Sequence, residues 1–185
     1  MGDSITFATR YREIGSKCAK AKAFDDRTGC YVVAEVLKEI REAPLSFSVF
    51  GAFTAQEEVG ARGAGVAAYS AEPDLVIVLE GTTASDVPEA EEHGHCTTLG
   101  KGPALSFMDA TAISNRKVLR RLLDVAEKNN IPVQFRRTTL GGTDAGRIHL
   151  QREGIPVAVV SVPTRYIHSP VSLINLEDLE NTKKL

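Results

Sequence analysis

No apolar run in the sequence approaches the roughly 18 residues that a membrane span needs, and the first residues lack the apolar core of a signal peptide. The 22 basic and 24 acidic residues are interspersed, so no stretch has the one-signed charge that attracts nucleic acid or an anionic membrane. Cysteine is scarce, and Cys18, Cys30 and Cys96 show no CxxC spacing, which argues against a disulfide framework. We therefore expect a cytoplasmic protein that binds neither nucleic acid nor membrane.

Two common catalytic signatures are also missing. The chain has no GxSxG motif, which argues against a serine esterase, and its acids are not placed as a pair flanking a sugar bond. The glycine-rich stretch 141–146 lacks both the Lys-Ser/Thr of a phosphate loop and the GxGxxG spacing, so nucleotide binding is not expected. We interpret this stretch as a wall of a substrate site, with Asp144 capping the helix that follows.

The length of 185 residues suits one domain with a sizeable core. Apolar runs and helical periodicity alternate along the chain. They predict strands at 4–9, 46–54, 74–80, 131–138 and 155–163, and helices at 26–42, 60–68, 112–129, 144–152 and 175–184. This order predicts an α/β three-layer sandwich with a largely parallel central sheet flanked by helices. Ligands of such sheets bind beyond the carboxyl ends of the strands.

Paired acids stand at one of these strand ends. Glu57 and Glu58 directly follow the run 47–54, and at a turn from strand to helix both side chains can reach one cavity. One carboxylate can then bind a metal ion while the other moves protons, as a metal-assisted hydrolase requires. Taken alone, the pair would more often be two solvated acids at a strand end.

Three further groups share this placement at element ends. Asp25 opens a helix, Glu80 ends the run 75–79, and His168 follows the run 155–163. Each has a plainer alternative: a helix cap for Asp25 with its neighbour Asp26, a rim acid for Glu80, and a structural histidine for His168.

The remaining histidines carry weaker signals. His93 and His95 are spaced like a chelating pair, but their acidic loop with proline and glycine favours exposure to solvent. His149 falls within a predicted helix and is interpreted as structural.

Four ordered motifs, at 23–29, 56–60, 141–146 and 165–170, together resemble the tetrahedral or glutamyl aminopeptidase family of dinuclear metallopeptidases, some of which are named endoglucanases. The resemblance covers nearly the whole chain and implies two divalent ions, zinc or cobalt. By position, Asp25 resembles the carboxylate that bridges both metals, followed by a cis peptide bond, and Glu57 resembles the general base. Glu58 and His168 resemble ligands of one metal, and Glu80 a ligand of the other, where the family more often has Asp.

The resemblance also implies that part of the family fold lies outside this sequence. Family members begin with a further stretch that carries a His ligand and most of an inserted dimerisation domain. Residues 1–20 then correspond to the final strand of that insertion and the return segment, and residues 21–185 to the C-terminal part of the catalytic domain.

The function implied is release of N-terminal amino acids from peptides. We expect little or no activity from this truncated chain, and a homo-oligomer for the full-length family. The alternative is a non-catalytic remnant that folds and binds metal weakly or only associates with partners.

Overall fold

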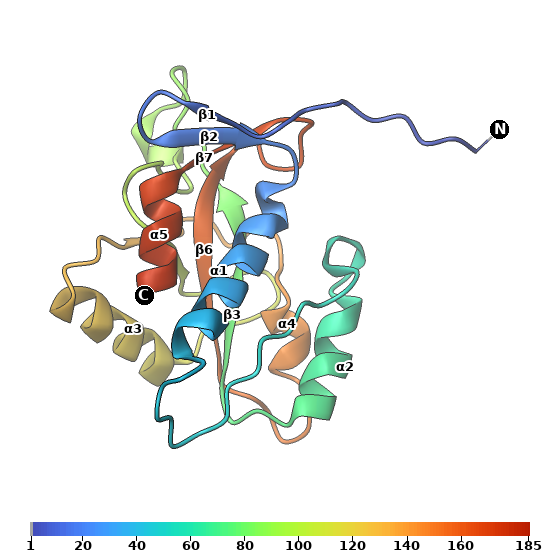
Figure 1. Cartoon of the computed structure of the whole chain (residues 1–185), viewed down its shortest axis with the longest axis vertical. Coiled ribbons are helices and arrows are strands. Elements are labelled where there is room, and N and C mark those ends of the chain that lie inside the picture. Colours follow the sequence, from blue (N-terminus) through green and yellow to red (C-terminus); the bar gives the residue numbers. More distant parts are fainter. Residues whose placement is uncertain (1) are drawn as a thin grey trace.

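The computed structural model describes residues 2–185, so residue 1 of the expected segment 1–20 lies outside it. One sheet is flanked by helices on both faces (Figure 1). Its strands are β1 (Arg12–Ile14), β2 (Cys18–Ala21), β3 (Val76–Thr83), β4 (Ala104–Ser106), β5 (Gln134–Phe135), β6 (Val157–Arg165) and β7 (Ser172–Asn175). The helices are α1 (Phe24–Ile40), α2 (Arg62–Ala71), α3 (Arg116–Lys128), α4 (Ala145–Ile148) and α5 (Leu176–Lys184), with short 3-10 turns η1 (Glu57–Val59) and η2 (Glu92–Gly94).

The strand β6 organises the sheet. It pairs in parallel with β3 along eight residues, and its other edge pairs antiparallel with β4 and β7. The hairpin β1–β2 extends the sheet beyond β7, again antiparallel, while β5 pairs in parallel with β4. The sheet is therefore mostly antiparallel, and the predicted largely parallel sheet is wrong. The physical reason is the length of the connections, because the short turns 15–17 and 166–171 can join only antiparallel neighbours.

The side chains of β6 alternate between two cores, and this alternation makes three layers. Val157 and Val159 pack with α2 and α4 on one face. Ala158 and Val160 pack with α3 on the other face, and Val162 joins the core beside α1 and α5. Because a strand alternates its side chains between faces, one fully buried strand serves both helical layers. The prediction of an α/β fold, with a central sheet flanked by helices, is therefore confirmed.

Several predicted elements differ from the structure. Residues 46–54 and 4–9 form no strand, the strand predicted at 131–138 shrinks to β5, and the helix predicted at 144–152 shrinks to α4. The strands β1, β2, β4 and β7 were not predicted. A strand needs a neighbour for its backbone groups, and among residues 2–185 none pairs with 46–54. Within the same residues, no helix has both the length and the apolar character of a transmembrane segment.

Candidate metal centre

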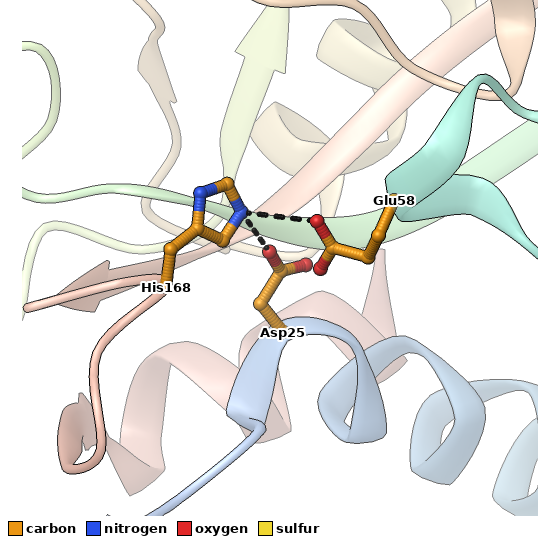
Figure 2. Close-up of side chains that lie close together, drawn as sticks. All are labelled: Asp25, Glu58 and His168. Atoms are coloured by element: carbon orange, nitrogen blue, oxygen red, sulfur yellow. Dashed lines mark hydrogen bonds and ion pairs between the residues drawn. The ribbon is translucent and has the colours of Figure 1, made fainter. Parts of the chain in front are cut away.

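Three side chains from distant parts of the chain meet at one point (Figure 2). Asp25 comes from the start of α1, Glu58 from η1, and His168 from the turn after β6. The Nε2 atom of His168 lies 2.9 Å from Asp25 Oδ2 and 3.4 Å from Glu58 Oε2. One potential ligand atom of each residue lies within 4.8 Å of the other two. Two carboxylates and an imidazole thus lie close enough together to hold one metal ion.

The backbone around these residues adopts uncommon conformations. His168 has a φ of 59°, and the residues before the two acidic motifs, Ala23 and Gln56, have φ values of 58° and 62°. Positive φ is disfavoured for residues with a Cβ and occurs preferentially at functional sites. The peptide bond between Asp25 and Asp26 is cis, as the family resemblance implied.

The adjacent acids Asp25 and Asp26 have different roles. Helical backbone angles begin only after Asp26, whose carboxylate accepts a hydrogen bond of 2.8 Å from the N–H of Gly29. Asp26 therefore caps α1 in the usual way, which satisfies one of the free N–H groups of the first turn. The capping alternative thus describes Asp26, while the carboxylate of Asp25 points to His168.

Glu80, in β3, interacts electrostatically with Asp25, one of the three converging residues. The hydroxyl of Ser161, its partner in β6, lies 3.4 Å from Glu80 Oε1 and can donate to it. Burial raises the pKa of Glu80 well above its usual value, and the negative charges of Asp25, Asp26 and Glu57 raise it further. Several carboxylates in one place repel one another unless protons or a cation compensate them.

Glu57 neighbours the converging side chains without joining them. Among the described residues, the set whose ligand atoms meet includes neither Glu57 nor Glu80. Burial, followed by the charges of Asp144, Glu58 and Asp25, raises the pKa of Glu57 to about 7. Glu57 is thus a carboxyl group with a pKa near neutrality beside a potential metal site, which is the range where a general base works best.

From the sequence, Asp144 was assigned the wrong role and Arg136 was not identified. The hydroxyl of Thr54 donates to Asp144 Oδ2 at 2.5 Å, and the side chain of Asp144 forms no cap on α4, contrary to the prediction. The side chain of Arg136 donates to the hydroxyl of Thr82 and is the positive charge that opposes Glu80. An acid directly after a glycine-rich turn was a usable signal for Asp144, whereas no sequence pattern marked Arg136.

The other histidines lie outside this site. His93 is exposed and pairs with Glu91 at 3.2 Å, and His95 Nε2 lies 3.3 Å from the carbonyl oxygen of Ala90. His149 Nδ1 lies 2.8 Å from the carbonyl oxygen of Ala145, one turn earlier in α4, as suits a structural residue. In the part of the chain that the structure describes, none of these histidines belongs to a group that could hold a metal.

Comparison with known proteins places this chain in a family. The sequence pattern of the M42 glutamyl aminopeptidases matches residues 1–185. The chain is 35% identical over 158 residues to the glutamyl aminopeptidase of Lactococcus lactis subsp. cremoris, covering 85% of this chain and 43% of that protein. It is 33% identical over 183 residues to the lysyl aminopeptidase of Pyrococcus furiosus, covering 97% of this chain and 50% of that protein. The chain thus spans about half the length of the curated relatives it matches.

Solved structures agree with these matches. The TET aminopeptidase of a marine sediment archaeon of the Thaumarchaeota superposes with a TM-score of 0.90 at 40% identity, over 95% of this chain and 50% of that one. The TET1 peptidase of Pyrococcus horikoshii, which can assemble into a tetrahedron or a large octahedral shell, superposes with a TM-score of 0.82 at 32% identity, over 97% of this chain and 52% of that one. The chain therefore belongs to the M42 glutamyl aminopeptidase family, a family of metal-dependent peptidases.

Proposed function

We propose that this chain carries the catalytic half of a metal-dependent aminopeptidase, which releases N-terminal amino acids from peptides. The observation that supports this most directly is the meeting of Asp25, Glu58 and His168, with Glu57 beside them and outside the ligand set. Such an arrangement separates the groups that bind metal from the group that moves a proton.

The donor atoms suit a divalent ion. Metal bonds of about 2.0–2.2 Å to nitrogen and oxygen place neighbouring ligand atoms about 3–4 Å apart in a tetrahedral site. The separations of 2.9 and 3.4 Å from His168 Nε2 fall near this range. Imidazole with carboxylates favours zinc or a similar transition metal such as cobalt. We assign Asp25, Glu58 and His168 to one ion, and Asp25 with Glu80 to a second.

A divalent ion in such a site supplies Lewis acidity toward a carbonyl oxygen and makes nearby water more acidic. Glu57 would accept a proton from the attacking water and return it to the leaving amine. In the metal-free chain, burial and then the neighbouring carboxylates raise the pKa of Glu57 to about 7. The burial that raises this pKa also limits competing solvent around the carboxylate.

We propose the substrate class and the assembly of this protein from those of its relatives. The matched relatives are named for glutamyl and lysyl cleavage at similar identities, so we propose peptides with a free N-terminus as the substrate class and assign no side-chain preference. We propose a homo-oligomer for the complete protein, by analogy with the TET1 peptidase. Residues 1–20 would end its dimerisation insertion, and the start of the described chain extends away from the sheet (Figure 1).

The competing proposal is a remnant without catalysis. It is supported by the second metal position, for which we assign two ligands among residues 2–185, Asp25 and Glu80, whereas a catalytic zinc normally has three protein ligands. Metal analysis separates the two proposals. The purified chain, incubated with zinc and dialysed, should retain one or more equivalents by plasma mass spectrometry, and Glu58→Gln should retain less. Glu42→Gln, at an exposed position on the surface, is the control. Absence of bound zinc in the unaltered chain would favour the remnant.

A further inference from the structure

A pocket of about 450 Å³ lies between α2 and the segment that begins with α4. Two arginines, Arg62 and Arg147, and the side-chain amide of Gln151 line it, and none of the described residues in its lining is acidic. Pockets of several hundred Å³ are typical of sites for small ligands. The lining gives this pocket hydrogen-bond donors and positive charge.

Neither of these arginines forms an ion pair with an acid among residues 2–185. The neighbouring Arg152, by contrast, pairs with Glu72 at 2.6 Å. The side chain of Arg147 donates from Nε to the carbonyl oxygen of Gly60 at 3.3 Å. This bond holds the guanidinium beside the turn that precedes α2, but it does not neutralise the charge. The positive charge of the pocket is therefore available to an anionic ligand.

Part of the pocket lining is apolar. Val66 and Tyr69 belong to it and expose 69% and 58% of their surface. The guanidinium of Arg152 lies 4.3 Å from the centroid of the Tyr69 ring and donates to the backbone oxygen of the same residue, so the ring is held from outside. A Cβ at residue 65 would come within 2.9 Å of Gln151 Nε2, so Gly65 allows this amide to lie against α2.

Positive charge beside apolar side chains suits a carboxylate that is attached to carbon. A guanidinium donates two parallel hydrogen bonds to a carboxylate, and a glutamine amide supplies a further donor. Inorganic phosphate would leave Val66 and the Tyr69 ring without a partner. The C-terminal residue of a peptide, in contrast, carries a carboxylate and a side chain that can cover them.

The pocket begins close to the candidate metal centre. Gly60 follows Glu58 by two residues, and two residues of chain span at most about 7 Å. A peptide of three or four residues spans about 10–14 Å when extended, which is longer than this step. We propose that the pocket binds the C-terminal carboxylate of short peptides through Arg62 and Arg147. The use of this contact in substrate selection rests on the proposed aminopeptidase function.

Titration of the nitrogen-labelled 185-residue chain with a peptide, followed by nuclear magnetic resonance, tests the pocket. The probe is an N-acetylated tetrapeptide of three alanines and a C-terminal leucine, added in the presence of a chelator. Acetylation removes the free amine that would bind a metal ion. We expect shifts of the side-chain amide of Gln151 and of the backbone amides of Gly60 and Gly65. Amidation of the peptide's C-terminus, Arg62→Gln and Arg147→Gln should each raise Kd about tenfold, because each removes a charge-assisted hydrogen bond.

Arg121→Gln is the matched control, because Arg121 is exposed on α3, which packs on the opposite face of the sheet. It should leave Kd unchanged, and an equal loss of affinity in this variant would show that net charge, and not the pocket, is responsible.

Three other outcomes would overturn the proposal. Equal binding of the amidated peptide would show that no carboxylate is recognised. Absence of shifts, or shifts confined to other residues, would show that the pocket does not bind the peptide. Displacement of the peptide by inorganic phosphate at lower concentrations than by acetate would assign the pocket to phosphate. None of these measurements depends on bound metal or on turnover, so failure of the proposed aminopeptidase function would leave them interpretable.

Discussion

His168 Nε2 lies 2.9 Å from Asp25 Oδ2, although the two residues are 143 positions apart in the sequence. The contact joins the start of α1 to the turn that follows β6, and Glu58 completes the group from η1 (Figure 2). An imidazole held by two carboxylates is a strong hydrogen-bonding arrangement when it is protonated, and a chelating one when a metal replaces the proton. Competition between protons and metal should therefore govern this site.

Exchange of each paired glutamate for glutamine distinguishes their roles. Glu58→Gln should lose bound metal, because its carboxylate lies 3.4 Å from His168 Nε2, whereas Glu57→Gln should keep most of it. In a chain completed by the upstream half of the family fold, Glu57→Gln should also lower kcat by about 10²–10⁴-fold, the usual contribution of a general base. Plasma mass spectrometry and steady-state kinetics measure the two effects. Equal metal loss in both variants would show that this division of roles is wrong.

The stability of the metal-free chain should fall as pH rises from about 4.5 to 7. Burial and neighbouring charges raise the pKa of Glu57 from 4.5 to about 7, and burial does the same for Asp26 from 3.8. Between these values the folded chain binds more protons than the unfolded chain, so the free energy of unfolding decreases with pH. The stability is fully present below the unfolded pKa values and is lost as pH passes through the folded ones.

Urea unfolding at pH 5 and pH 8, in the presence of a chelator, measures this trend. Glu57→Gln carries no charge at either pH and should be more stable than the unaltered chain at pH 8. Glu153→Gln, at an exposed turn, should differ little from it. A stability that rises between pH 5 and 8, or a destabilised Glu57→Gln at pH 8, would contradict the assignment of mutual repulsion to this site.

Gly29→Ala should destabilise the fold next to the candidate metal centre. A Cβ at residue 29 would collide with the carboxylate of Asp26 and come within 2.6 Å of the carbonyl oxygen of Leu79 in β3. Overpacking of this kind typically costs about 1–3 kcal/mol. We expect a lower Tm by roughly 2–10 °C in a chain of this size, measured by circular dichroism. Gly94→Ala is the control, because a Cβ there meets no atom within 4 Å, and an equal loss in both variants would rule out the collision as the cause.

The 185-residue chain should show little or no aminopeptidase activity with added zinc or cobalt. We assign one ion to Asp25, Glu58 and His168, whose ligand atoms converge. For the second ion we assign two ligands among residues 2–185, Asp25 and Glu80, which is one fewer than a catalytic zinc site normally has. Aminoacyl-anilides are suitable substrates for the assay, beside a chain extended by the upstream half of the family fold. Comparable turnover from both chains would show that the upstream half is dispensable for chemistry, and His93 and His95 would be the next residues to exchange.

Helices and the buried central strand were predictable because their signals are local. The helix predicted at 26–42 corresponds to Phe24–Ile40, and that at 175–184 to Leu176–Lys184. The apolar run 155–163 became β6, since only a strand buried on both faces has so few polar residues. Hydrophobic periodicity is a property of neighbouring residues, so it needs no knowledge of the rest of the fold.

Strand pairing was not predictable in the same way. Residues 46–54 have the composition of a strand but no partner among residues 2–185, and the direction of β7 depends on the turn 166–171 that precedes it. Strand pairing depends on two segments of the chain. A hydrophobic pattern describes only one of the two.

The same distinction between local sequence and tertiary structure applies to the candidate site. The sequence by itself determined which chemical groups stand at element ends, because carboxylates and a histidine beside apolar runs are visible as residue types in order. Only the tertiary structure decided that Asp25, Glu58 and His168 meet while Asp26 turns away to cap α1. It also decided that Glu57 and Glu80 share a partly buried, negatively charged environment. Distances between side chains and the burial that shifts a pKa arise from packing across the whole sheet, which no local stretch of sequence contains.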